Sequence, residues 1–172
     1  MVFDFRKTAF PAPVLPAGFW FVPWNKDLTE AHGDILHRSF KDDLDGSVFT
    51  TFRQINHCVN LIAMVANGNS FLSPATLLIA YGDPDGLFEY VANIQGLKLS
   101  AEIGAVQNVG VLPEYRKRGI GQALVCGALI AFKKAGVQKV TLEATADNLS
   151  AMKLYHRIGF TTYRTYFREI FP

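Results

Sequence analysis

The segment that decides the fold runs from Val109 to Leu124 and reads VGVLPEYRKRGIGQAL. It starts with the end of an apolar extended stretch, which a proline closes. Three basic residues and two glycines follow, and apolar residues then recur at helical spacing. The segment therefore predicts a strand, a basic glycine-bearing turn and a helix. In that order, the unbonded N–H groups of the first helical turn lie at the end of a strand and favour an anion.

Three interpretations of this turn compete. It could be an Arg/Gly turn that only starts a helix. It could belong to a dinucleotide-binding G-x-G-x-x-G turn, but Leu124 stands where that motif needs its third glycine. It could bind a pyrophosphate, because Gly119 and Gly121 leave the main chain accessible while the helix dipole and three cations attract several negative charges. The residues that follow favour the third interpretation.

Periodicity and turn residues predict the remaining elements on either side of this segment. The expected strands cover 18–24, 75–81, 88–94, 103–112, 139–145 and 160–171, and the expected helices cover 28–40, 51–66, 120–134 and 149–158. The strand at 18–24 is expected to be the first of the chain. A loop containing Asp42, Asp43, Asp45 and Gly46 is expected after the first helix.

A second block lies downstream, LEATADN at 142–148, followed by Ala151, Leu154, Tyr155, Gly159 and Phe160. Together the two blocks resemble the GNAT acyltransferases, whose coenzyme A signature is Q/R-x-x-G-x-G/A. Arg116, Gly119 and Gly121 occupy its defining positions. The resemblance covers roughly 103–160. It is strongest to the branch that acetylates protein N-termini, such as the ribosomal-protein acetyltransferases.

The resemblance implies an α/β (α+β) fold of the GNAT type in a single domain over 1–172. A mixed central sheet of about six to seven strands would carry helices on both faces. A bulge in the strand at 103–112 would splay it from its parallel neighbour and open a crevice for the coenzyme.

By the same resemblance the cosubstrate is acetyl-CoA and the partner is an amine acceptor, a small molecule or a protein N-terminus. Main-chain groups of Val109 and Val111 would contact the pantetheine arm and thioester, and Asn148 would hydrogen-bond the arm. The residues expected to bind the coenzyme are Val109, Gly110, Val111, Arg116, Lys117, Arg118, Gly119, Ile120, Gly121, Gln122 and Asn148.

An amine must lose a proton before it attacks a thioester, because its pKa lies near 10. The resemblance implies Glu143 as the base, directly or through water, and Tyr155 as the acid that protonates the departing thiolate. Glu143 has an alternative role in shaping the crevice by hydrogen bonds to loop backbone. Glu102 is a reserve base. The alternative function is an inert acyl-CoA sensor or scaffold of the same fold.

Composition, the first residues and histidine spacing argue against several classes of function and location. A formal charge of +2 is too small to predict a nucleic-acid protein, and no apolar run is long enough to span a membrane. The first residues do not resemble a secretory signal, so a cytoplasmic location is expected. No metal site is predicted from the spacing of His32, His37 and His156, and Cys58 and Cys126 are expected to be buried.

Two further regions have open interpretations. Arg53, His57 and the acidic loop lie where this family covers its acceptor site, but acidic runs are usually solvated loops. The aromatic ending (Tyr163, Tyr166, Phe167 and Phe171) suits a homodimer face, and packing of a sheet on its own helices explains it equally well.

Overall fold

The computed structural model describes residues 1–43 and 48–166. Six strands form one mixed sheet in the order β1-β6-β5-β4-β3-β2. All neighbours pair antiparallel except β5 and β6, which run parallel. The strands are β1 (Val2–Asp4), β2 (Phe19–Pro23), β3 (Leu77–Gly82), β4 (Phe88–Lys98), β5 (Ile103–Val111) and β6 (Lys139–Leu142). The predicted mixed sheet is confirmed.

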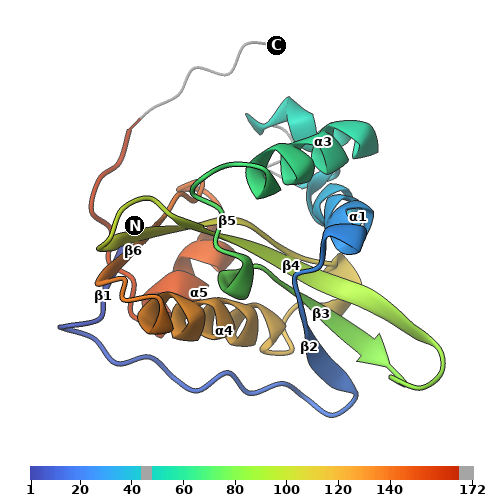
Figure 1. The fold of residues 1–172 in the computed structure, drawn as a ribbon, viewed down its shortest axis with the longest axis horizontal. Helices are drawn as coiled ribbons and strands as arrows, with labels where there is room; N and C mark the ends of the chain where they lie inside the picture. Colours follow the sequence, from blue (N-terminus) through green and yellow to red (C-terminus); the bar gives the residue numbers. More distant parts are fainter. Residues whose placement is uncertain (44–47, 167–172) are drawn as a thin grey trace.

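Helices cover both faces of this sheet (Figure 1). One face carries α1 (Thr29–Phe40) and α3 (Ile55–Ala66), and the other carries α4 (Ile120–Lys134) and α5 (Leu149–Ile158). Short 3-10 turns lie at Lys26–Leu28, Thr50–Arg53, Ser73–Ala75 and Pro113–Tyr115. Within the described ranges, no helix combines the length and apolar character needed to cross a membrane.

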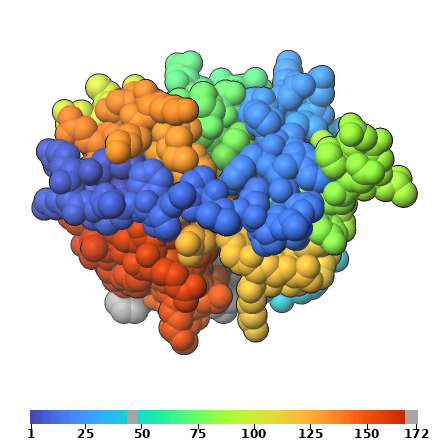
Figure 2. Space-filling model, turned by 90° about the horizontal axis from the view of Figure 1, so that it is seen from below, coloured from blue at the N-terminus to red at the C-terminus, as the bar shows by residue number. Residues whose placement is uncertain are grey.

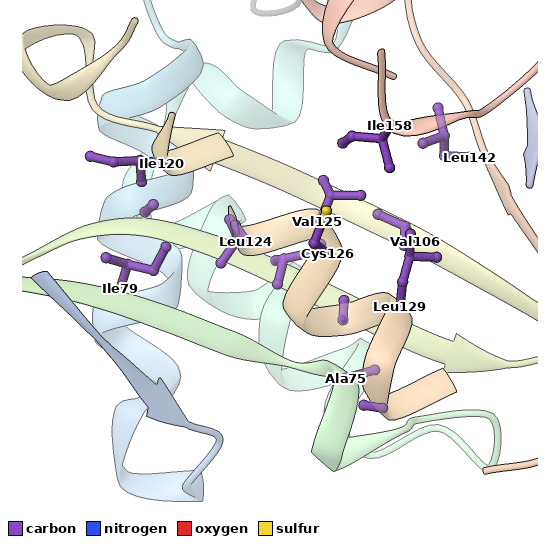
Figure 3. Packing of buried hydrophobic residues seen from close by; sticks show 14 of the residues in the cluster. Ala75, Ile79, Val106, Ile120, Leu124, Val125, Cys126, Leu129, Leu142 and Ile158 are labelled. Atoms are coloured by element: carbon purple, nitrogen blue, oxygen red, sulfur yellow. The ribbon is translucent and has the colours of Figure 1, made fainter. Parts of the chain in front are cut away.

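The main core lies between the sheet and α4. Figure 3 shows Leu124, Val125 and Leu129 of α4 packed against side chains of the strands and of α5. The helix is buried along most of its length, which explains its nearly continuous apolar sequence. The segment that links β1 to β2 crosses the outside of this layer as a continuous band (Figure 2).

Four expectations about the elements need correction. β1 precedes the strand that was expected to be first. The second helix begins at Ile55, because the chain is extended at Gln54 after a 3-10 turn. β6 ends at Leu142, three residues before the expected end. The last expected strand is not formed over 160–166, where only an isolated bridge joins Thr161 to Val2. The rest of that expected strand, with Phe167 and Phe171, lies outside the described residues. Asp45 and Gly46 of the expected acidic loop also lie outside them.

A smaller core joins α1 to α3 around Leu36, Cys58 and Ile62. Next to it, His32 of α1 is 0% exposed, and its ring lies 5.0 Å from that of Trp24. Neither ring nitrogen has a hydrogen-bond partner in the described part of the chain. Burial lowers the pKa of His32 to about 3, because a charged imidazole would lose its hydration there.

This histidine predicts an acid-sensitive fold. Its pKa in the folded state lies below the ordinary value of 6.5, so the unfolded chain takes up the proton first as the pH falls. Stability should be complete above about pH 6.5 and decrease toward pH 3, by roughly a few kcal/mol. Urea unfolding of wild type and His32→Leu at pH 7.5 and 5 measures this. The variant should lose less stability than wild type between the two pH values; equal losses would contradict the prediction.

Candidate coenzyme and catalytic site

The basic turn has the conformation of an anion-binding loop. Gly119 caps α4 with φ 81°, and Lys117 also has a positive φ, 61°. Nothing lies within 4 Å of a Cβ placed on Gly119, so conformation rather than lack of space requires glycine there. Successive amides in alternating right- and left-handed conformations form a concave set of donors, which is a common way to hold a phosphate.

Six consecutive amides are available in this turn. The main-chain N–H groups from Lys117 to Gln122 have no acceptor among the described residues, and the next one, Ala123 N–H, bonds to the Gly119 carbonyl. The first three amides of α4 lie at the positive end of its dipole. These amides belong to residues that the family resemblance implies for coenzyme binding. A diphosphate bearing several negative charges fits this donor set.

The two glycines have different structural roles. A Cβ on Gly121 would lie 3.2 Å from Leu154 Cδ2 and 3.7 Å from Val111 Cγ2. Gly121 therefore allows α4 to approach α5 and the end of β5. Close approach of phosphate was the reason expected for both glycines, and the structure adds this packing role for Gly121.

The three cations of the turn are not equivalent. The Arg116 guanidinium donates to the Ser39 carbonyl (2.7 Å) and the Val111 carbonyl (3.0 Å), and it forms an ion pair with Asp43 (3.0 Å). Arg118 donates to the Glu114 carbonyl at 3.2 Å and lies over the Tyr115 ring. The guanidinium of Arg116 therefore connects the turn to the end of α1 and to β5, and it faces its own protein rather than an open anion site.

The strand beside the turn is splayed as expected. β5 pairs with β6 only from Ile103 to Val106, because β6 ends at Leu142. In the described structure, the rest of β5, through Val109 to Val111, has no strand along this edge. On its other side β5 is bulged, since Asn108 and Val109 together face one residue of β4, and Asn108 has φ 54°. A bulge of this kind bends the strand and increases the local twist.

α5 brings the second motif next to this edge. Asn148 caps the helix, and its Oδ1 accepts from the Ala151 N–H at 3.1 Å. Tyr155 lies two turns later, 6% exposed, with its ring 6.0 Å from that of Phe160. Glu143 follows β6 directly and is exposed, whereas Leu142 before it is buried. The described residues show no hydrogen bond from loop backbone to the Glu143 carboxylate.

The other candidate residues have local roles. Glu102 accepts from Gln138 at 2.7 Å, and the His37 and His156 rings each contact a backbone carbonyl. Arg53 and His57 are exposed. Both cysteines are buried, as expected, and burial raises the pKa of each thiol to about 11. No cluster of three or more potential metal ligands occurs in residues 1–43 and 48–166.

Four polar residues near the bulge were missed. Asn93 and Gln95 of β4 are fully buried, Ser39 of α1 is 2% exposed, and Asn108 donates its side-chain amide to Gln95 Oε1. The sequence contained a signal, because Asn93 and Gln95 interrupt an apolar strand at alternate positions. Alternate positions share one face of a strand, and here that face is covered by α1.

A family model described as "Acetyltransferase (GNAT) family" matches residues 18–160. A mycothiol acetyltransferase of Kocuria rhizophila is 35% identical over 97 residues, which are 54% of this chain and 32% of that protein. An N-alpha-acetyltransferase 30 of Schizosaccharomyces pombe is 35% identical over 65 residues, which are 38% of this chain and 43% of that protein. The chain thus matches less than half the length of either relative.

Solved structures show the same fold. The ribosomal-protein-S18-alanine N-acetyltransferase from Escherichia coli superposes with a TM-score of 0.64 at 18% identity. The match covers 85% of this chain and 79% of that one. The overall fold is therefore shared with a solved acetyltransferase.

Proposed function

Because the chain belongs to the acetyltransferase (GNAT) family, we propose that it transfers an acetyl group from acetyl-CoA to a primary amine. The observation that carries this proposal is the pairing of two features. Six consecutive amides without an acceptor in the described chain lie at the start of α4, and the free edge of β5 lies beside them. Acetyl-CoA has the two parts that these features suit, a pyrophosphate and an extended arm with amide groups.

In this proposal the amides from Lys117 to Gln122 hold the pyrophosphate, and the main chain from Val109 to Val111 pairs with the arm. Asn148 contacts the arm from the start of α5 while its Oδ1 caps that helix. Lys117, which is exposed in the turn, adds a positive charge. Arg116 positions the turn, because its guanidinium holds the backbone of α1 and β5.

Transfer then needs two proton movements. The amine loses a proton, for which Glu143 is the proposed acceptor, directly or through water. The amine nitrogen attacks the thioester carbon, the carbon–sulfur bond breaks, and Tyr155 gives its hydroxyl proton to the thiolate. The Val109 N–H is the proposed donor to the carbonyl oxygen while it carries negative charge; one such donor contributes about 3–4 kcal/mol in enzymes where it was removed. No covalent intermediate with the protein is required.

The acceptor amine is a small molecule or a protein N-terminus. In this proposal α1 and α3, which lie on the face of the sheet opposite α4 and α5 (Figure 1), select the acceptor. The chain shares its family with both mycothiol and N-alpha-acetyltransferases, so both acceptor classes belong in the first assay.

The test mixes the protein with acetyl-CoA and a panel of amines and N-terminal peptides, and follows free thiol. Turnover with at least one acceptor is expected, together with saturable binding of coenzyme A in a titration. Binding without turnover on a broad panel would favour the inert sensor or scaffold. Absence of coenzyme binding would refute both.

A further inference from the structure

A set of buried polar atoms lies beside the β5 bulge. Asn93 is 0% exposed, and neither its Oδ1 nor its Nδ2 has a hydrogen-bond partner in the described chain. The same holds for Gln95 Nε2 and Ser39 Oγ. Buried polar side chains in native proteins nearly always have a partner, either protein or ordered water. Unsatisfied atoms on one face of β4 and on the helix that covers it therefore require an explanation.

These atoms adjoin both ends of the bulge. Asn93 is the registered partner of Gly110, and a Cβ on Gly110 would lie 2.6 Å from Asn93 Oδ1 and 2.9 Å from Ser39 Oγ. At the other end, Gln95 Oε1 accepts from the side chain of Asn108, whose φ is positive. Val109 lies between these two anchored positions.

Water is the occupant that suits this site. The atoms offer two amide donors, one amide acceptor and a hydroxyl, and a buried water typically makes about three hydrogen bonds to such groups. Each of these four side-chain atoms is sealed from solvent, so a larger ligand could reach them only if α1 moved. The lining groups are neutral.

We propose that Asn93, Ser39 and Gln95 enclose ordered water and, with Asn108, hold the β5 bulge in its splayed shape. They would be positioning residues, acting through the Val109 amide that is the proposed oxyanion donor. The functional half of this inference, the positioning of the Val109 amide, rests on the proposed acetyl transfer. The structural half, the ordered water that holds the bulge, does not.

Asn93→Leu tests the structural half, because it keeps side-chain size and removes both hydrogen-bonding atoms. If water bridges these atoms, the variant leaves Ser39 Oγ and the water without the hydrogen bonds of the Asn93 amide. Tm should then fall by roughly 2–8 °C. If the site is dry, the variant removes an unsatisfied amide and Tm should rise. A crystal structure of wild type should also show water within hydrogen-bond distance of Asn93. A raised Tm or a dry site would overturn the proposal.

The rate tests the functional half. Asn93→Leu should lower kcat by about 10- to 100-fold, a fraction of the loss seen when an oxyanion donor is removed, with coenzyme affinity and amine KM unchanged. Asn93→Ser, which retains a donor and an acceptor and leaves room for another water, should restore most of the rate. An altered amine KM with unchanged kcat would instead indicate that the acceptor enters this site, and would overturn the positioning role.

Thr76→Val is the matched control. Thr76 is also fully buried, but its hydroxyl is satisfied, donating to the Leu72 carbonyl and accepting from the Gly96 N–H. The control should lower Tm and leave kcat unchanged, which separates general destabilisation from loss of positioning. If wild type transfers no acetyl group, the proposed function fails, while the Tm of Asn93→Leu and the crystallographic water still decide whether the site is hydrated.

Discussion

Tyr155→Phe is expected to lower kcat by about 100-fold or more and to leave the affinity for coenzyme A unchanged. The side chain is 6% exposed, and its ring packs against Phe160, so phenylalanine keeps that packing. Only the hydroxyl is lost, and with it the proposed proton donor to the thiolate. The thiolate would then depart without general-acid assistance. Steady-state rates together with a coenzyme titration measure the two quantities separately.

The matched control is Tyr163→Phe, which removes the same atom from a tyrosine that is 83% exposed and outside the regular elements. It should behave as wild type. If Tyr155→Phe retains the wild-type rate in an active enzyme, Tyr155 is not the acid, and another group must protonate the leaving thiolate. If neither protein turns over but both bind coenzyme A, the sensor alternative gains support.

Gln122→Pro is expected to weaken coenzyme A binding by about 10- to 100-fold, the effect of one hydrogen bond to a charged group. Gln122 is the third residue of α4, where the amide has no intrahelical acceptor. Proline is tolerated in the first helical turn and removes only this N–H from the main chain. A titration calorimeter measures the change directly.

Gln122→Ala is the control, because it removes the same side chain and keeps the N–H. It should bind coenzyme A nearly as well as wild type. Equal dissociation constants for the two variants would mean that this amide does not contact the pyrophosphate. Far-ultraviolet circular dichroism and Tm establish that α4 is still formed in both.

The basic turn illustrates how the structure refines a motif. In the sequence, Arg116, Lys117 and Arg118 are three neighbouring charges that are expected to attract one anion. In the fold, Arg116 binds the carbonyls of Ser39 and Val111, and Arg118 binds that of Glu114. Their spacing along the chain could not show this, because the Ser39 carbonyl comes from a helix far away in sequence. The main-chain amides from Lys117 to Gln122 and the exposed Lys117 side chain have no partner among the described residues.

Local segments were predictable from the sequence. The strand, turn and helix around Arg116 to Gly121 follow from periodicity and from glycine, whose effects act within a few residues. The bounds of α5 also agree with the prediction, because Asn148 caps one end and Gly159, with φ 113°, closes the other. The resemblance to a family added the splayed strands, and the pairing of β5 with β6 confirms them.

Distant pairings were not predictable. β1 has only three residues, and its partner β6 lies near the other end of the chain, so no local pattern distinguishes it from a loop. β6 was predicted too long because alternation continues past Leu142, whereas the chain leaves the sheet there. Phe160 and Tyr163 have strand propensity. However, the described segment after the Thr161 bridge pairs with no strand of the sheet.

The sequence by itself determined the strand–turn–helix unit and the unbonded amides of the first helical turn, because both arise from hydrogen-bonding rules within one short stretch. Only the tertiary structure decided which side chains form bonds within the protein. The Arg116 guanidinium donates hydrogen bonds to backbone carbonyls of α1 and β5, and Asn93 is buried with Ser39 beside the bulge. Both outcomes depend on how closely α1 approaches β5 at Gly110, a distance set by packing across the sheet.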